Sequence, residues 1–142
     1  MIIGRKIKMS GEKERLEEIL SYYKIKDYND ENSIIYVLEE DDTIIGGCRI
    51  SVNNNIGVLK YLVIDHNKTG ENFGDGLLRA ALNYCYLNGI KKVYHSKTNS
   101  YLLKKGFIHN SKGDNSSGLC RDIQSNSDLV CIVDEFFSKG CR

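Results

Sequence analysis

The feature that most constrains the fold is a change of hydrophobic pattern near the middle of the chain. Three β-rich runs, over 34–38, 43–52 and 56–64, are separated by two short polar turns, and this spacing is typical of an antiparallel meander. After residue 76 the apolar side chains recur at helical spacing, and the predicted helix ends at Gly89 in the C′ position. A meander that runs into a single helix fits neither regular βαβ winding nor a β-sandwich. The pattern therefore favours a sheet of mixed strand direction with a central helix.

Shorter elements are predicted on both sides of this centre. A strand over 2–8 and an amphipathic helix over 11–24, capped by the hydroxyl of Ser10, precede the polar loop 25–33 and the meander. The segments predicted after the central helix are a strand over 91–94, a short helix over about 98–105, a strand over 107–109, a loop over 110–127, a strand over 129–133 and a helical turn or tail over 134–142. We therefore expect an α/β (α+β) fold: a mixed, mostly antiparallel sheet with a central helix after its fourth strand and further helices flanking it.

Length and composition indicate one globular domain over residues 1–142. Hydrophobic residues make up 41% and charged residues 27%, which is ordinary for a folded protein. The net charge of +1 provides no broad basic surface for nucleic acid or for an anionic membrane. No apolar run approaches the roughly 18–20 residues of a membrane-spanning helix. The start of the chain, MIIGRKIKM, is too short and too charged for a signal peptide.

The five cysteines indicate a reduced, cytoplasmic protein. Their number is odd, their spacing is wide and no export signal precedes them. Structural zinc sites pair their ligands at spacings of about two to four residues, and these cysteines lie farther apart, so we expect no metal. A thiol- or metal-dependent regulator acting through the C-terminal cysteines is the least favoured function. The cysteines are Cys48, Cys85, Cys120, Cys131 and Cys141.

The junction over 59–81 carries the strongest functional signal. A strand leads into a glycine-containing loop, and the loop opens a helix, whose first amides have no partners within the helix. Gly74 and Gly76 have no side chains, so a ligand can come close to the backbone, and the helix dipole favours an anion there. The junction therefore suits a phosphate or pyrophosphate. A Walker loop and a dinucleotide fingerprint are both disfavoured, because no Gly-Lys-Ser/Thr ending occurs and Arg79 stands where a third glycine would be.

Several motifs in this order resemble the GNAT superfamily of N-acetyltransferases, which use acetyl-CoA. Residues 39–47 (EEDDTIIGG) resemble the hairpin before that family's third strand, and residues 62–65 (LVID) resemble the end of its fourth strand. Residues 71–76 occupy the place of the Q/R-x-x-G-x-G/A pyrophosphate loop, and residues 101–107 (YLLKKGF) resemble the segment F-Y-x-K-x-G-F. The resemblance covers about residues 34–108, with a looser match before them.

The resemblance implies that acetyl-CoA binds between the fourth and fifth strands, which splay apart in that family's twisted sheet. Backbone of the fourth strand would hold the pantetheine arm and the thioester carbonyl, and amides of the loop would hold the pyrophosphate. The implied activity is direct transfer of the acetyl group to a primary amine of an unknown small molecule or peptide, and a homodimer is compatible with it. The residues assigned to the cofactor in this way are Leu62, Val63, Ile64, Glu71, Asn72, Phe73, Gly74, Asp75 and Gly76.

Two carboxylates depart from the family's pyrophosphate loop. Glu71 stands at the Q/R position, and Asp75 replaces an apolar residue between the glycines. At ~7 Å in a solvated loop, each carboxylate opposes binding by about 0.6 kcal/mol per phosphate charge. Lys68 and Arg79 offset part of this, so we expect about a tenfold loss of coenzyme affinity. A non-catalytic module with the same fold, which binds coenzyme A weakly or serves as a partner subunit, is therefore the alternative function.

The acid–base residues also depart from the family's pattern. Leu102 stands where the family has its tyrosine acid, and Tyr101 precedes it by one residue, which is a rotation of ~100° on a helix. Tyr101 is therefore either the acid that protonates the departing thiolate or a packing residue. The fourth strand contains no glutamate to act as base, so the candidate bases are His66, Asp65 and His95, and the two histidines are the more usable near neutral pH. We name Tyr101 and His66 as the candidate catalytic residues.

Overall fold

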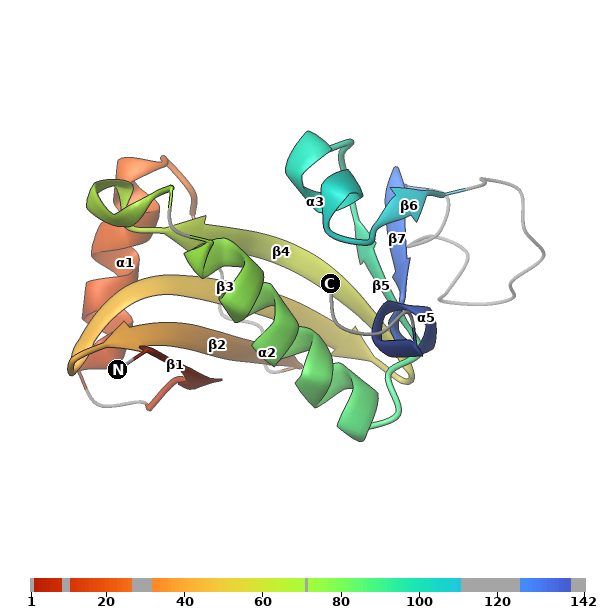
Figure 1. Cartoon of the computed structure of the whole chain (residues 1–142), viewed down its shortest axis with the longest axis horizontal. Helices are drawn as coiled ribbons and strands as arrows, with labels where there is room; N and C mark the ends of the chain where they lie inside the picture. Colours follow the sequence, from red (N-terminus) through yellow and green to blue (C-terminus); the bar gives the residue numbers. More distant parts are fainter. Residues whose placement is uncertain (1, 9–10, 27–31, 71, 111–125, 139–142) are drawn as a thin grey trace. The chain divides into compact units, whose positions relative to one another are not determined.

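The structure is a computed structural model of the 142-residue chain, and it describes residues 2–8, 11–26, 32–70, 72–110 and 126–138. The elements in chain order are β1 (Ile2–Lys6), α1 (Glu12–Tyr22), β2 (Ser33–Glu40), β3 (Thr43–Asn53), β4 (Ile56–Ile64), the 3₁₀ turn η1 (His66–Lys68), α2 (Phe73–Leu87), β5 (Lys92–His95), α3 (Ser100–Lys104), β6 (Ile108–His109), β7 (Leu129–Ile132) and α5 (Val133–Ser138) (Figure 1). Within the described residues, seven strands form one sheet in the order β1-β2-β3-β4-β5-β7-β6.

The sheet is mixed and mostly antiparallel, as the sequence predicts. Strand β1 pairs with β2, β2 with β3, β5 with β7 and β6 with β7 in antiparallel fashion, whereas β4 and β5 run parallel. The expected meander appears as the neighbours β2, β3 and β4, and helix α2 follows the fourth strand. The α+β fold is thereby confirmed. The chain folds as two compact units. One unit contains Met1–Ser51 and Lys60–Tyr84, and the other contains Val52–Leu59 and Cys85–Arg142. The expected single domain stays a prediction.

Three of the differences between the predicted and the observed boundaries concern α1, β2 and α2. Ser10 lies outside the described residues, and the residue at the N-cap of α1 is Gly11, which has no side chain with which to cap the helix. Strand β2 continues through the expected turn, because a register shift lets Glu39 and Glu40 keep pairing with β3. Helix α2 begins at Phe73, ahead of the glycine pair that was expected to precede it.

In the unit formed by Met1–Ser51 and Lys60–Tyr84, helices α1 and α2 cover opposite faces of the strands (Figure 1). Neighbouring residues of a strand point to opposite faces. In β2, Val37 belongs to the cluster that α1 covers, whereas the ring of Tyr36 lies 6.0 Å from that of Tyr84 in α2. Because both faces are covered, β3 is buried at every residue from Ile44 to Ile50.

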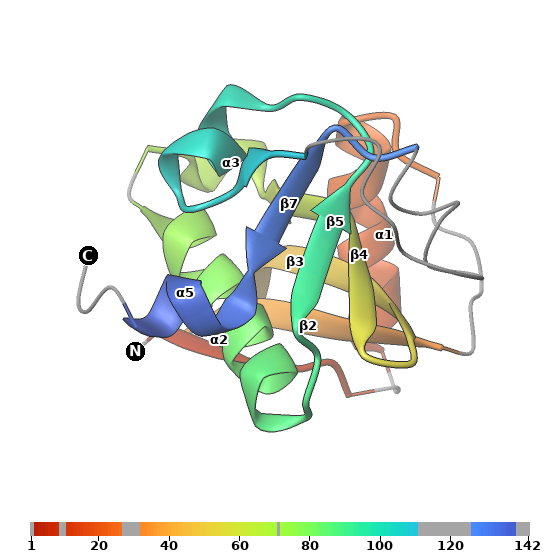
Figure 2. The same ribbon diagram turned by 90° about the vertical axis from the view of Figure 1, so that its right-hand side faces the viewer.

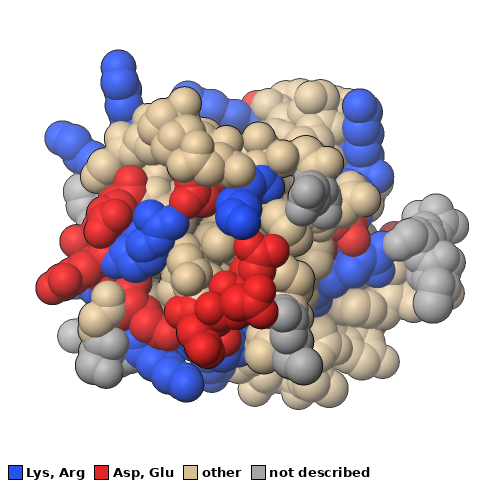
Figure 3. Space-filling model, turned by 60° about the vertical axis from the view of Figure 1, so that its left-hand side comes forward, with Lys and Arg blue, Asp and Glu red and all other residues tan. Residues whose placement is uncertain are grey.

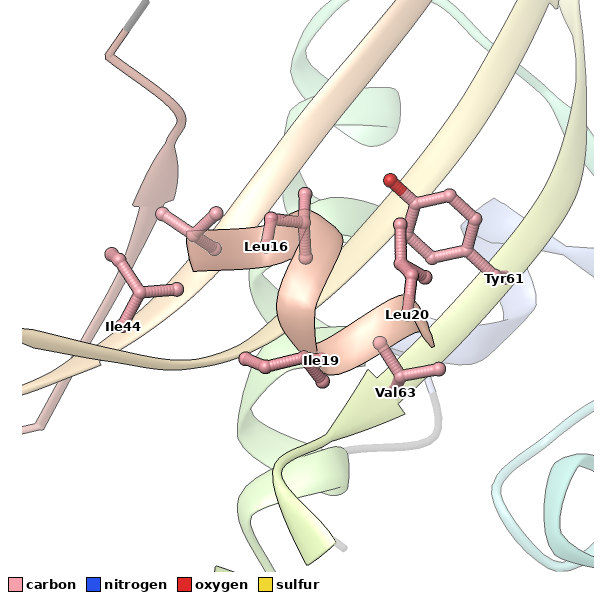
Figure 4. Packing of buried hydrophobic residues seen from close by; sticks show 7 residues of the cluster. Leu16, Ile19, Leu20, Ile44, Tyr61 and Val63 are labelled. Atoms are coloured by element: carbon pink, nitrogen blue, oxygen red, sulfur yellow. The ribbon is translucent and has the colours of Figure 1, made fainter. Parts of the chain in front are cut away.

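The apolar stripe of α1 forms the core of this unit. Leu16, Ile19 and Leu20, which the sequence places at helical spacing, are at most 3% exposed. Leu16 can approach β3 closely because Gly47 has no side chain, and a Cβ at that position would overlap the methyl groups of Leu16. The cluster drawn in Figure 4 contains Leu16, Ile19, Leu20, Val37, Ile44, Tyr61 and Val63.

The unit formed by Val52–Leu59 and Cys85–Arg142 has a smaller core around β5 and β7, which lie side by side in Figure 2. Ile56, Tyr94 and Val130 form one buried cluster, with Ile132 packed against it. Helix α3 begins after Asn99, whose side-chain oxygen accepts the amide of Leu102 at 3.1 Å. The predicted short helix at 98–105 is therefore present as Ser100–Lys104.

Candidate functional site

The C-terminal end of β4 supplies the first part of the candidate site. Val63 is buried, and Leu62 and Ile64 are half-buried. The carbonyl of Ile64 accepts a hydrogen bond of 2.6 Å from the hydroxyl of Tyr23, which follows α1. Burial raises the pKa of the Tyr23 phenol, and the charges of Tyr22 and Asp65 act in the same direction. The hydroxyl therefore stays protonated and can donate.

Strand β3 also constrains the end of β4. The amide of Asp65 donates to the carbonyl of Ile45 at 2.7 Å. Gly46 lies so close that a Cβ there would come within 2.8 Å of the carbonyl oxygen of Val63. A side chain at Gly46 would push the two strands apart, so the glycine pair in the third predicted strand serves close packing at this end of β4.

The carboxylate of Asp65 forms the corner between β4 and η1. One oxygen accepts the amide of Asn67 at 3.0 Å, and the other accepts Arg15 of α1 at 2.5 Å. These bonds hold the pKa of Asp65 below its usual value, the amide of Asn67 contributing most and burial opposing the shift. Asp65 is therefore a stable anion with fixed partners, and a lowered pKa makes a carboxylate a poorer general base.

The imidazole of His66 stacks on the ring of Tyr22. The two rings are 3.8 Å apart at their centroids and nearly parallel, at 7°. Nδ1 of His66 is 3.5 Å from a carboxylate oxygen of Asp65, and 44% of the His66 side chain is exposed. One face of the ring is thus covered by α1, and one ring nitrogen faces a carboxylate. The structure brings His66 together with Tyr22, Tyr23 and Asp65.

The first turn of α2 supplies the second part of the site. Glu71 lies outside the described residues, and Asn72 precedes the helix with φ 60°. The helix starts at Phe73, so helical geometry offers the amides of Phe73 and Gly74 no acceptor within the helix. The amide of Gly76, by contrast, donates to the carbonyl of Asn72 at 3.3 Å. Gly76 therefore contributes open space rather than an amide, since a Cβ there would meet nothing within 4 Å.

The charges around this helix start are paired. Asp75 accepts Arg79 of the next turn at 2.9 Å, and Lys68 bonds to Glu40 at 2.7 Å. Figure 3 shows acidic side chains gathered on the side of the molecule that carries α1 and the β2–β3 turn, with basic side chains between them. Both cations that were expected to offset the acidic loop thus have carboxylate partners, and Arg79 reduces the field of Asp75 directly.

The predicted acid, Tyr101, belongs to the unit formed by Val52–Leu59 and Cys85–Arg142. Its side chain is on α3, 38% exposed, with the ammonium of Lys105 5.6 Å from the centre of its ring. Leu102, at the position of the family's tyrosine, is 2% exposed and packs in the core. The two neighbours therefore face different surroundings, as a rotation of ~100° per residue requires.

In the same unit, His95 ends β5. Its Nδ1 lies 3.0 Å from the carbonyl oxygen of Leu59 in β4. His95 is half-buried, whereas Leu59 is 2% exposed.

Sequence reasoning missed two side chains that hold the site. Arg15 appears in the sequence only as a polar residue of an amphipathic helix, and Tyr23 only as part of its apolar stripe. Arg15 reaches a carboxylate 50 residues away, and Tyr23 reaches a carbonyl 41 residues away. The one local signal is the aromatic pair Tyr22-Tyr23 at the helix end, a place where apolar rings with polar tips often meet a partner.

The cysteines and the helices bear on metal and membrane binding. No three His, Cys, Asp or Glu side chains among the described residues come together as a metal site. Cys48, Cys85 and Cys131 are buried free thiols, and burial raises the pKa of Cys85 to about 12. Cys120 and Cys141 lie outside the described residues. Of the helices in the described part of the chain, none has the length and apolar character that crossing a membrane requires.

The fold is α+β, and helix α2 follows the fourth strand. Residues 6–103 match the model of the acetyltransferase (GNAT) family. Because this match spans more than half of the chain, the chain belongs to the acetyltransferase (GNAT) family. A comparison with curated proteins found no significant match.

Solved structures of other proteins have the same fold. The N-acetylglutamate synthase of Neisseria gonorrhoeae, complexed with coenzyme A and N-acetyl-glutamate, is 18% identical with a TM-score of 0.71, over 94% of this chain and 35% of that chain. The PaiA N-acetyltransferase of Thermoplasma acidophilum, in complex with coenzyme A, is 18% identical with a TM-score of 0.68, over 93% and 99%. Tetrahymena GCN5 is 17% identical with a TM-score of 0.75, over 92% and 96%. This chain thus spans about a third of the length of the synthase, and likeness at these identities shows the fold alone.

Proposed function

We propose that this chain is an N-acetyltransferase that binds acetyl-CoA and transfers its acetyl group directly to a primary amine. Membership of the acetyltransferase (GNAT) family supports the reaction class. Two of its structural neighbours were crystallised with coenzyme A, which supports the co-substrate. The observation that carries the proposal is the start of α2 at Phe73, directly after β4 and η1, with open space beside Gly76.

The proposed coenzyme site uses backbone rather than side chains. The amides at the start of α2, at Phe73 and Gly74, would bind the pyrophosphate, because first-turn amides and the helix dipole both favour an anion. Asn72 turns the chain into the helix, and Gly76 leaves room for the ligand to approach. The pairing of Asp75 with Arg79 weakens its repulsion of phosphate, which is the offset that the sequence predicts for Arg79.

The proposed reaction forms a carbon–nitrogen bond and breaks the thioester carbon–sulfur bond. The backbone of Leu62, Val63 and Ile64 would hold the pantetheine arm and the thioester, with an amide near Val63 for the oxyanion. The hydroxyl of Tyr101 would protonate the departing thiolate, and His66 is the base named from the sequence.

A second candidate, a non-catalytic module of the same family, has one specific observation in its favour. Leu102 occupies the position of the family's tyrosine and is packed in the core at 2% exposure, so no acid can act from that position. Catalysis then depends on Tyr101, whose side chain is 38% exposed.

Titration calorimetry with acetyl-CoA and with coenzyme A separates these functions. We expect micromolar binding, followed by thiol release from acetyl-CoA in the presence of an accepted amine. Tyr101→Phe should keep the affinity for acetyl-CoA and lower turnover about 10²-fold or more. Tyr86→Phe, which removes an exposed hydroxyl from α2, is the matched control and should change neither.

Each outcome of this experiment has a distinct meaning. Binding weaker than about millimolar would overturn the acetyltransferase proposal and favour a partner subunit. Binding with turnover that Tyr101→Phe leaves unchanged would keep the acetyltransferase and remove Tyr101 as its acid.

A further inference from the structure

The last peptide group of β4 is held from two opposite sides. The amide of Asp65 donates to the carbonyl of Ile45 in β3 at 2.7 Å. The carbonyl of Ile64 accepts the hydroxyl of Tyr23 at 2.6 Å. In a trans peptide group the N–H and C=O bonds point in opposite directions, so the carbonyl of Ile64 points away from β3. These residues all belong to the unit formed by Met1–Ser51 and Lys60–Tyr84.

The carbonyl of Ile64 therefore lies on the edge of β4 that is opposite β3. The parallel register of β4 with β5 covers Ile56–Val58. In the described part of the chain, the last residues of β4, Leu62–Ile64, have no strand partner on that edge. Backbone groups on such an edge are open to other partners. At Ile64, the hydroxyl of Tyr23 supplies the donor that a neighbouring strand would otherwise supply.

The position of Tyr23 is fixed by the way in which α1 ends. The amide of Lys24 donates to the carbonyl of Ser21 at 3.0 Å. The amide of Ile25 donates to that of Leu20, also at 3.0 Å, and these two bonds form a Schellman motif. Lys24 adopts the left-handed conformation of this motif, with φ 60°, although glycine adopts it at less cost. The backbone thus defines the helix end, and Tyr23 stands at its C-cap.

Helix α1 is itself anchored at this corner of the sheet. Nε of Arg15 donates to the carbonyl of Ile44 at 3.1 Å, and another nitrogen of the same guanidinium donates to the carboxylate of Asp65 at 2.5 Å. The apolar stripe of α1 packs on the same strands. Because the helix is held by both kinds of contact, the hydroxyl of Tyr23 meets the carbonyl of Ile64 in a fixed direction.

The carbonyl that Tyr23 holds can still bind a ligand. A carbonyl oxygen has two lone pairs, and the hydroxyl uses one of them. The pantetheine arm of coenzyme A contains secondary amides, whose N–H groups are hydrogen-bond donors. The proposed function places this arm on the backbone of Leu62, Val63 and Ile64. An acceptor whose direction is fixed before the ligand arrives has less freedom to lose on binding, and this favours affinity.

We propose that Tyr23 is a positioning residue for the coenzyme: its hydroxyl fixes the carbonyl of Ile64 so that the remaining lone pair accepts an N–H group of the pantetheine arm. This assignment rests on the proposed acetyl transfer. Tyr23 acts through Ile64 and not on the reacting atoms. The KM for acetyl-CoA should therefore depend on the hydroxyl, whereas turnover at saturating acetyl-CoA should stay within about twofold without it.

The hydrogen bond is tested first, in the protein without coenzyme. Tyr23→Phe removes the hydroxyl and keeps the ring. In carbon NMR of the backbone, we expect the carbonyl resonance of Ile64 to shift upfield in this variant, because the carbonyl loses its donor. The resonance of Leu62 should stay in place. An unchanged resonance of Ile64 would overturn the proposal whether or not coenzyme A binds.

The role in binding is tested with coenzyme A and with ADP, which carries the pyrophosphate but no pantetheine arm. Calorimetry measures coenzyme A directly, and ADP is measured by its competition with coenzyme A. We expect Tyr23→Phe to weaken coenzyme A about three- to tenfold, the effect of one hydrogen bond, and to leave ADP within about twofold. Tyr86→Phe, which removes an exposed hydroxyl from α2, is the control and should change neither affinity.

The other outcomes would overturn the proposal in distinguishable ways. If Tyr23→Phe weakens coenzyme A and ADP equally, the substitution loosens the fold, and the hydroxyl has no specific role toward the arm. If the affinity for coenzyme A is unchanged or rises, the hydroxyl does not help the ligand to bind. If the wild-type protein does not bind coenzyme A, the proposed function fails and the positioning role fails with it, whereas the NMR result on Ile64 stands.

Discussion

Replacing Gly76 by alanine should raise the stability of the fold and lower its affinity for coenzyme A. Gly76 lies inside α2, where its amide already bonds to the carbonyl of Asn72, and an added Cβ would meet nothing within 4 Å. Alanine in a helix interior is favoured over glycine by about 0.5–1 kcal/mol. No overpacking offsets this gain. For a chain of this length we expect the midpoint of thermal unfolding to rise by roughly 1–4 °C.

The binding effect should have the opposite sign. If a pyrophosphate approaches the backbone through the open space beside Gly76, the added methyl group displaces it. Overpacking of this kind costs about 1–3 kcal/mol, so the dissociation constant for coenzyme A should rise about tenfold. Asn83→Ala is the matched control, because it improves helix propensity at an exposed position of the same helix and leaves the loop unchanged.

The measurements are thermal unfolding without ligand and titration calorimetry with coenzyme A. A gain in stability with unchanged affinity would refute the placement of the pyrophosphate beside Gly76. A loss of stability would refute the open space itself, and that outcome would stand even if coenzyme A did not bind.

Three further perturbations test the charges and the core. Asp75→Asn should raise the affinity for coenzyme A about threefold, since a carboxylate at ~7 Å opposes each phosphate charge by about 0.6 kcal/mol; calorimetry at low and high salt should show the gain shrinking as salt rises. Hydrogen bonds from Arg5 hold the pKa of Glu12 at about 2, below the ordinary 4.5. Glu12→Gln should therefore lower the free energy of unfolding by roughly 1–3 kcal/mol near neutral pH. Urea unfolding should show this difference from the wild-type protein disappearing as the pH falls from about 4.5 to about 2. A difference in stability that persists in acid would contradict this. Gly47→Ala should lower the free energy of unfolding by about 1–3 kcal/mol, because the added methyl group crowds Leu16. Much of that loss should vanish when Leu16 is also replaced by alanine. If the two substitutions have strictly additive effects in urea unfolding, the contact is refuted.

The order of strands and helices could be predicted because each element has a local signal. Alternation and turn residues mark the meander, and Ile56–Ile64 begins and ends where its apolar run does. The start of α2 was harder, because Gly74 and Gly76 read as loop residues. Gly74 costs little there, since the first turn of a helix lacks internal acceptors in any case and Asn72 turns the chain into it.

The side-chain contacts of the site could not be predicted, because they join residues far apart in the sequence. Tyr23 reaches the carbonyl of Ile64 across 41 positions, and His95 reaches that of Leu59 across 36. Helical and strand periodicity place a residue on a face but do not say which residue of another element it meets. Candidate residue types were therefore predictable, whereas their partners were not.

Those partners set how the ionisable side chains near the end of β4 can behave. Asp65 was a candidate by its position after β4, but the amide of Asn67 and the guanidinium of Arg15 stabilise its charged form and lower its pKa. Such a carboxylate gains little by taking a proton from an ammonium ion. A backbone carbonyl acts differently on a histidine, because it fixes which nitrogen is protonated without adding a charge. Asp65 is thereby a structural anion, whereas the hydrogen bond to Leu59 only sets which nitrogen of His95 carries the hydrogen.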